Sequence, residues 1–383
     1  MFTGYKHDIM TPAKQYPFYF KSTVIIFGLV LICYALNSLS DILAPIAFSF
    51  VIAILLNPFV NKLQQKGLKK VLAISIALTL TIVCVAGILY FISTQLMNFG
   101  DNLPELKAKF NEHFKDIQQW AAGNLKISLA KQQKMINDAT SGSQALIGKT
   151  LGGAFGVIGF FILVPIYVFL LLYYKTLMIN FLHEVFAEKN TDKVSEVLGQ
   201  TKTAIQSYMV GLLLEALVVA MLNSVALFIC GVEYAILLGV IGALLNMLPY
   251  IGGIVAIALP VLIAAVTKDG FGTPLAIIAS YTLIQFIDNN FLVPFLVSSR
   301  VKINAFFSIV IVLMGGALWG VSGMFLSIPF LAILKIIFDR LPEMKPWGKL
   351  LGDEIPTRHK GEIWMRRRKK SSVAEKVVED SKV

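Results

Sequence analysis

The stretch VLAISIALTLTIVCVAGILYFISTQLM, from Val71 to Met97, carries no acidic or basic side chain. A helix of this length is sufficient to cross about 30 Å of hydrocarbon. A helix also pairs its own backbone N–H and C=O groups, which is needed because lipid offers them no hydrogen bonds. The stretch therefore predicts a transmembrane helix.

Further apolar blocks on both sides of this stretch predict an all-α polytopic membrane protein. Single spans are expected at Ser22–Leu39, Ile42–Val60, Val71–Met97, Leu151–Tyr174, Ile205–Cys230 and Thr273–Val297. Two longer blocks, Tyr234–Val266 and Asn304–Phe338, lie on either side of the last of these. The first span leads directly into the second and lacks a small-residue cleavage site, so we expect a retained helix and not a signal peptide.

The composition agrees with a protein that uses lipid as its solvent. Hydrophobic residues make up 56% of the 383 residues, charged residues only 15%, and the mean hydropathy is +0.73. The net charge of +11 comes from basic residues in loops and a tail, so we expect contact with the lipid bilayer and not with nucleic acid. The three cysteines lie singly in apolar segments, which predicts neither a disulfide framework nor a metal site.

Helix-disfavouring residues interrupt both long blocks near their middles. The first block contains Pro249, Gly252 and Gly253, and the second contains a run of glycines that includes Gly320 and Gly323. The blocks also resemble each other in the order of their residues: Gly242-Ala-Leu-Leu, Gly253 and Ala258-Leu-Pro260 correspond to Gly316-Ala-Leu-Trp, Gly323 and Ser327-Ile-Pro329. Paired interrupted segments of this kind predict an internally repeated transporter with its site at the breaks.

Charge predicts the topology. Counting each long block as one crossing gives about eight spans, and re-entrant or double-crossing blocks give about six or ten. Because each count is even, both termini share one side, and their basic residues place that side in the cytoplasm. The expected order is a cytoplasmic tail (1–21), three spans (22–97), an extracytoplasmic amphipathic insertion (98–148), a fourth span (149–175), a cytoplasmic amphipathic insertion (176–204), a transport core (205–339) and a basic cytoplasmic tail (340–383).

The extracytoplasmic insertion carries apolar residues at helical spacing, which predicts an amphipathic helix opened by Asp101, Asn102 and Pro104. Such a helix lies on the membrane surface or against its neighbours, or forms a lid or a subunit contact. The apolar positions are Phe99, Leu103, Leu106, Phe110, Phe114, Ile117 and Trp120.

Catalytic motifs are missing from the sequence. The segment Gly320-Val-Ser-Gly323 has the spacing found around the serine nucleophile of rhomboid proteases. That chemistry needs a base within hydrogen-bond reach, and every histidine falls in a tail or a loop. We therefore expect no catalytic residue, no cofactor and no enzymatic activity.

Two polar features lie inside apolar segments, where a charge costs about 3 kcal/mol to insert. Glu215 lies within a predicted span, where a carboxyl group suits proton exchange or bonds to a neighbouring helix. The second feature is Gln285-Phe-Ile-Asp-Asn-Asn-Phe-Leu-Val-Pro294, whose carboxylate and amide oxygens suit a small cation or a polar solute. A polar lock between helices, or a helix end at the membrane surface, is the structural alternative.

These features predict a transport pathway that lies between the interrupted segments and the polar span. Its expected residues are Glu215, Asn246, Pro249, Tyr250, Gly252, Gly253, Gln285, Asp288, Asn289, Asn290, Pro294, Gly320 and Gly323.

Roughly from residue 20 to residue 340, the chain resembles the autoinducer-2 exporter family of bacterial membrane proteins. The likeness rests on Leu248-Pro-Tyr-Ile-Gly-Gly253, on Asp288-Asn-Asn-Phe-Leu-Val-Pro294 and on the glycine-rich run Gly315–Gly323 that leads to Ile328-Pro329. The matching positions are Pro249, Tyr250, Ile251, Gly252, Asn290, Leu292, Pro294, Gly320, Gly323, Met324 and Pro329.

The chain departs from the family pattern at several positions. Gly253 occupies a position where the family has proline. Asp288-Asn289 replaces the family's Glu-Gly, and Asn304-Ala305 replaces its His-Pro. The resemblance implies a homo-oligomeric inner-membrane protein that exports autoinducer-2, a quorum-sensing signal, or exchanges sodium for protons by antiport. Export of a small polar signal is the leading expectation, cation/proton antiport is second, and a non-transporting membrane scaffold is third.

Overall fold

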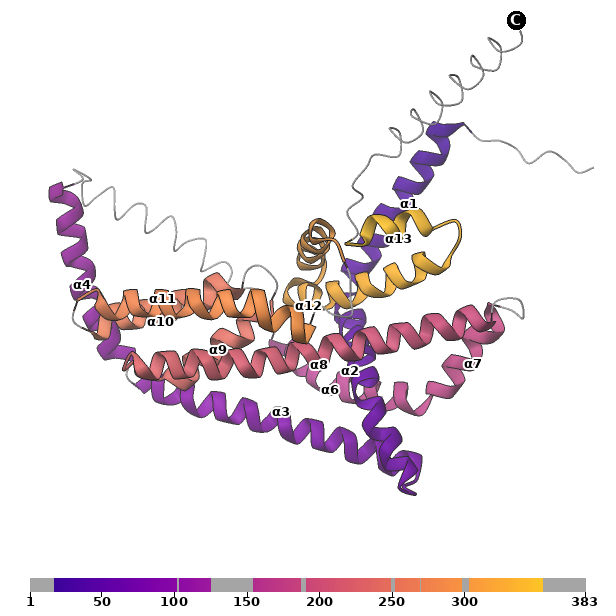
Figure 1. Cartoon of the computed structure of the whole chain (residues 1–383), viewed down its shortest axis with the longest axis horizontal. Coiled ribbons are helices and arrows are strands. Elements are labelled where there is room, and N and C mark those ends of the chain that lie inside the picture. Colours follow the sequence, from indigo (N-terminus) through magenta and orange to yellow (C-terminus); the bar gives the residue numbers. More distant parts are fainter. Residues whose placement is uncertain are drawn as a thin grey trace, which may run out of the picture. The chain divides into compact units, whose positions relative to one another are not determined.

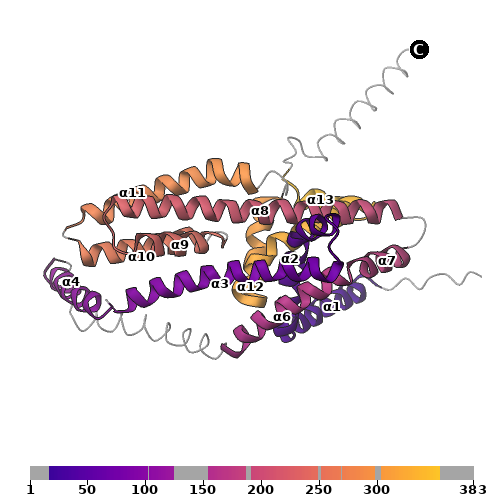
Figure 2. The same cartoon turned by 90° about the horizontal axis from the view of Figure 1, so that it is seen from below.

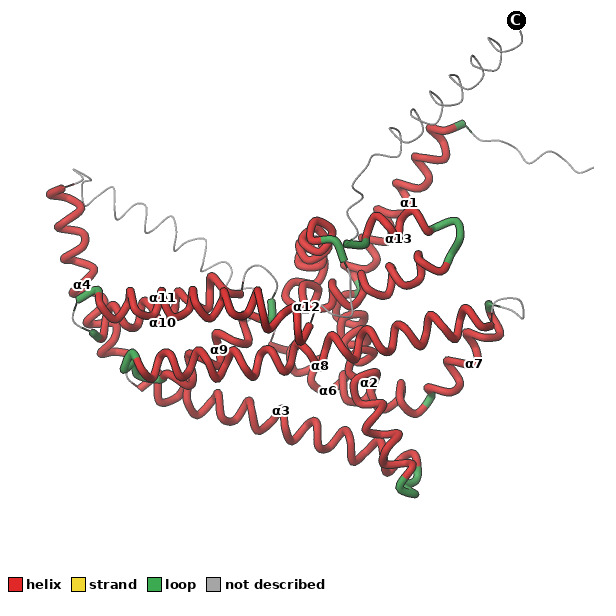
Figure 3. Tube along the Cα trace, in the orientation of Figure 1, coloured by secondary structure: helices red, strands yellow, loops and turns green. Residues whose placement is uncertain are grey.

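The computed structural model describes residues 17–101, 103–124, 154–186, 191–248, 252–268, 270–297 and 303–353. Every regular element in this part of the chain is a helix (Figure 3). The helices are α1 (Phe18–Ser38), α2 (Ser40–Gln65), α3 (Lys70–Asp101), α4 (Leu103–Asn124), α6 (Ala154–Tyr173), α7 (Lys175–Val185), α8 (Thr191–Ile229), α9 (Ala235–Asn246), α10 (Gly252–Thr267), α11 (Gly272–Ile287), the π-helix η1 (Asp288–Val297), α12 (Ala305–Arg340) and α13 (Lys345–Leu351). The predicted all-α polytopic fold is confirmed.

The chain forms two compact units. Unit 1 comprises Met1–Met178, Leu259–Pro274 and Val312–Leu326, and unit 2 comprises Ile179–Ala258, Leu275–Ile311 and Ser327–Val383. The boundaries fall inside α7, α10, α11 and α12, so each unit is built from segments that are not consecutive in the chain.

Unit 1 has its core where α2, α3 and α6 meet. Small residues such as Ala73 and Ala77 let the helices approach closely, and Ile74, which is fully buried, fills the space between them. The hydroxyl of Ser49 donates across this interface to the Val164 carbonyl oxygen at 3.2 Å. By contrast, most side chains of α1 are exposed, which is typical of a helix that faces lipid.

Unit 2 is organised along α8, the longest helix in the described part of the chain, which packs on α9 and η1 (Figures 1 and 2). The absence of a side chain at Gly211 permits the contact with η1, because a Cβ there would lie 3.1 Å from the Val297 Cα atom. Helices α9 and α10 turn back on each other, so that a Cβ on Gly242 would lie 3.5 Å from the Ala256 Cβ atom. The first interrupted block is therefore a helical hairpin of two short arms.

The second interrupted block is a hairpin as well. Helix α12 breaks at Trp319 and Gly320, where Gly320 adopts φ 58° and ψ −139°. A positive φ is readily available only to glycine. The arms on either side then face each other: the Ser327 hydroxyl donates to the Ile311 carbonyl oxygen at 3.0 Å.

Within the described residues, six helices are long and apolar enough to cross a membrane, or up to seven if the bent pair of α6 and α7 counts as one span. This number is below the expected eight or so because α9 and α10, at 12 and 16 residues, are each shorter than a full span. Of the predicted amphipathic insertion, α4 confirms a helix from Leu103 onward, and residues 125–148 lie outside the described part.

Candidate transport site

The site is centred on Asp288, where the helix of the polar segment changes from α to π geometry. Pro294 lies within the π-helix, and because proline lacks a backbone N–H it cannot continue the α-helical hydrogen-bond ladder. Single-turn and short π-helices occur often at functional sites, because they turn side chains out of the regular register.

Amide groups from two helices fix the Asp288 side chain. The Asn246 amide Nδ2, at the end of α9, donates to Asp288 Oδ2 at 2.9 Å, and Gln285 Nε2 donates to the same oxygen at 3.4 Å. Gln285 Nε2 also lies 3.4 Å from Asn289 Oδ1. With 2% of its surface exposed, Asp288 is a buried carboxyl group held by neutral donors.

Glycines at the start of α10 allow this close approach. A Cβ on Gly253 would lie 2.8 Å from Gln285 Oε1 and 3.6 Å from Asn246 Oδ1. A Cβ on Gly252 would collide with the Leu245 backbone of α9. Both glycines are needed because the backbone of α10 passes directly against the polar cluster.

Glu215 of α8 and Asp288 line one cavity of about 580 Å³. Glu215 is itself buried, with 5% of its surface exposed. No lysine, arginine or histidine is among the residues that the structure places around this cavity. The lining residues are Tyr208, Leu212, Glu215, Asn246, Met247, Leu248, Gly253, Ile257, Gln285, Asp288, Asn289, Val293 and Val297.

The remaining expected residues divide into three groups. Asn290 and Pro294 are exposed and do not line the cavity, and the Asn290 amide donates to the Phe286 carbonyl oxygen at 2.8 Å. Gly320 and Gly323 lie at the bend of α12, among residues of unit 1. Pro249 and Tyr250 fall outside the described residues.

Sequence reasoning missed three polar side chains: Tyr208, which lines this cavity, and Asn223 and Tyr281, which line a smaller cavity that also touches Asp288. Tyr281 precedes Gln285 by four positions and Asp288 by seven, so the helical period already places it on the same face. That spacing was the available signal for Tyr281. The tyrosines and the asparagine carry no formal charge, so they do not stand out in an apolar segment.

A chain of membrane-spanning helices with buried carboxyl and amide groups around an intramembrane cavity has the construction of a transporter. The sequence profile described as AI-2E family transporter matches residues 22–343, and the chain belongs to this family. The Asn304-Ala305 departure from the family's His-Pro pair has a local explanation, because the Asn304 side chain caps α12 by accepting from the Phe306 N–H at 2.9 Å.

Several curated proteins are similar over most of their length. A candidate transport protein of Haemophilus influenzae is 26% identical over 341 residues, which is 85% of this chain and 94% of that protein. The AI-2 transport protein TqsA of Escherichia coli is 24% identical over 340 residues, 86% of this chain and 95% of TqsA. YrrI of Bacillus subtilis, also described as a candidate transport protein, is 24% identical over 318 residues, 80% of this chain and 88% of YrrI.

Proposed function

We propose that this chain exports a small polar signalling molecule of the autoinducer-2 kind across the bacterial inner membrane. The observation that carries the proposal is the cavity of about 580 Å³, which combines apolar walls with two carboxyl groups and three amide side chains. Small-molecule pockets span about 300–1,000 Å³ and orient their ligands with a few placed polar groups. The AI-2 transport protein TqsA, similar over nearly its whole length, supports the same class of solute.

Antiport of sodium and protons is the second candidate function. It is favoured by Glu215 and Asp288, which line the same cavity without a basic side chain among the described lining residues. Carboxyl groups inside a membrane protein mark paths for protons and ions.

Proteoliposomes that contain the purified protein test the proposal. We expect efflux of labelled small polar solutes from a panel that includes autoinducer-2, and loss of efflux in Asp288→Ala and Glu215→Ala. Efflux that is unchanged in both variants would remove these residues from the pathway. A pH-sensitive dye with sodium pulses separates the two functions, because an antiporter moves protons when sodium is added. A chain that moves neither solute nor ions would instead fit a membrane scaffold.

The proposal includes the arrangement of the protein in the membrane. We expect both termini in the cytoplasm, because the basic residues lie near both ends of the chain, and we expect a homo-oligomer. Protease digestion of right-side-out and inside-out vesicles tests the orientation of the termini. Cross-linking in native membranes tests the oligomer.

A further inference from the structure

A second, much smaller cavity of about 10 Å³ lies in unit 2. This volume corresponds to a single water-sized guest, since about 10–15 Å³ is needed to hold one. We call it the small chamber, and its lining residues are Val219, Asn223, Gly242, Asn246, Gly253, Ala256, Tyr281, Ile284, Gln285 and Asp288.

Three oxygens on lining residues of the small chamber have no hydrogen-bond partner in the described protein: Asn223 Oδ1, the Tyr281 hydroxyl and Asp288 Oδ1. Their side chains are 3%, 4% and 2% exposed. Buried polar atoms are nearly always paired, because an unpaired one costs about 1–3 kcal/mol. Three such atoms around one small space therefore indicate a bound partner that they share.

The described protein groups that donate to Asp288 all use the other carboxylate oxygen. The amides of Asn246 and Gln285 both donate to Asp288 Oδ2, which leaves Oδ1 to the partner. Lysine, arginine and histidine are missing from the described lining of the small chamber as well as of the large cavity. A buried carboxyl group in such surroundings is stabilised either by a bound cation or by taking up a proton.

We propose that the small chamber binds one dehydrated monovalent cation, sodium, through Asp288, Asn223 and Tyr281. Carboxylate, amide and hydroxyl oxygens are the hard donors that sodium prefers. A divalent ion is a poorer fit, because calcium takes about six to eight oxygens and magnesium keeps several of its waters. A lone water would pair the three oxygens but would leave the charge of the carboxylate unmatched.

The position of the small chamber gives the cation a role in transport, an extension that rests on the proposed function. Asn246, Gly253, Gln285 and Asp288 line both the small chamber and the large cavity. A cation bound at Asp288 Oδ1 therefore holds in place the shared side chains that the solute contacts in the large cavity. Sodium binding and solute binding are coupled through these shared side chains.

Binding of radioactive sodium to the purified full-length protein in detergent tests the site without any need for transport. We expect saturable binding that lithium competes for and that choline does not, because choline is larger than the small chamber. Tyr281→Phe removes one oxygen and should weaken binding about tenfold or more. In Gly242→Ala the new Cβ lies 3.2 Å from Asn223 Nδ2 and 3.7 Å from the Tyr281 hydroxyl, so it should weaken binding as well.

Matched controls make the same chemical changes elsewhere. Tyr90→Phe alters a tyrosine of α3 that is 73% exposed, and Gly87→Ala adds a methyl group with no atom within 4 Å. Both should bind sodium as the unmodified protein does, and all variants should elute as a single peak in size-exclusion chromatography. The conservative Tyr281→Phe variant keeps the test decisive if Gly242→Ala fails to fold.

The possible results test the sodium site and the proposed export function independently. No saturable sodium binding, or binding that Tyr281→Phe leaves unchanged, overturns the site and indicates a water in the small chamber. Solute efflux from liposomes in sodium-free buffer would in that case leave the export function standing. Sodium binding that depends on Tyr281, in a protein that moves no solute, would support the site and contradict the export function.

Discussion

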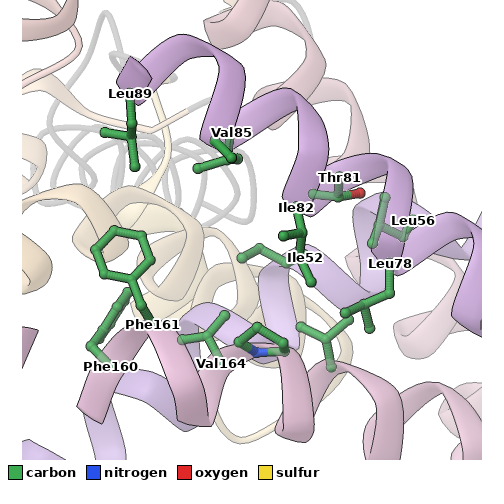
Figure 4. Close-up of a pocket in the computed structure, with 13 residues that line it drawn as sticks. Ile52, Leu56, Leu78, Thr81, Ile82, Val85, Leu89, Phe160, Phe161 and Val164 are labelled. Atoms are coloured by element: carbon green, nitrogen blue, oxygen red, sulfur yellow. The ribbon is translucent and has the colours of Figure 1, made fainter. Parts of the chain in front are cut away.

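The cavities of the two units have opposite linings. In unit 1, α2, α3 and α6 surround a pocket of about 380 Å³, and Figure 4 shows aliphatic and aromatic side chains converging on it. Its polar side chain is Thr81, whose hydroxyl donates to the Ala77 carbonyl oxygen of its own helix at 2.9 Å. In unit 2, the cavity of about 580 Å³ is lined by two carboxyl groups and three amide side chains.

The contrast shows that volume alone does not identify a transport site. A polar solute must exchange its hydration for protein hydrogen bonds, and the pocket of unit 1 offers only the Thr81 hydroxyl, whose hydrogen is already bonded within its own helix. The cavity of unit 2 offers carboxyl and amide oxygens held by a network that is itself hydrogen-bonded. We infer that unit 2 contacts the solute and that unit 1 supports the protein in the membrane.

The largest effect is expected from Asp288→Ala. This change removes the acceptor of the Asn246 and Gln285 amides and one of the two carboxyl groups of the cavity, so we expect efflux from proteoliposomes to fall about 100-fold. The control is Asp101→Ala, at an exposed position in α3 of unit 1. An equal loss of efflux in both variants would contradict the inference that the solute contacts unit 2 and not unit 1.

A tenfold loss of efflux is expected from Gly253→Ala. The added Cβ would lie 2.8 Å from Gln285 Oε1, the end of a flexible side chain, so Gln285 must shift even though the cost in stability is small. Gln285 then moves away from Asp288, and a solute affinity measured by equilibrium binding should fall in parallel with efflux. Gly87→Ala is the matched control, and a Gly253→Ala variant with normal solute affinity would contradict the packing argument.

Ser49→Ala should lower stability while leaving transport intact. The Ser49 hydroxyl bonds the carbonyl oxygens of Pro45 at 2.6 Å and Val164 at 3.2 Å in the core of unit 1. Its loss should cost about 1 kcal/mol in the free energy of unfolding, seen as a lower thermal midpoint in detergent. Impaired efflux at a temperature where the variant is fully folded would give unit 1 a direct part in transport.

The smallest effect is expected from Thr81→Val. The replacement has nearly the same shape and removes only a hydroxyl that is satisfied within α3. Efflux and thermal midpoint should both stay within error of the unmodified protein. A clear drop in efflux would mean that a solute contacts the pocket of unit 1.

The sequence predicted the membrane-spanning helices well because each contains a long apolar run, and the positions of the breaks followed from glycine and proline. It predicted hairpin-like segments at the breaks but left open whether they are re-entrant or spanning, and contacts that hold a hairpin together, such as Ser327 with Ile311, came only from the structure. Asn246 and Asp288 were each predicted as site residues, but their pairing joins positions far apart in the chain. Tyr281 and Asn223 were missed because their role depends on unpaired atoms that only the fold brings together.

The most direct test of the account is the water accessibility of the two cavities, measured with a membrane-impermeant thiol reagent. In a background with Cys33, Cys84 and Cys230 replaced by serine, Asn289→Cys should react, lose efflux on modification and be protected by transported solute. Thr81→Cys should remain unmodified and active. Reaction at Thr81→Cys with no reaction at Asn289→Cys would contradict the account.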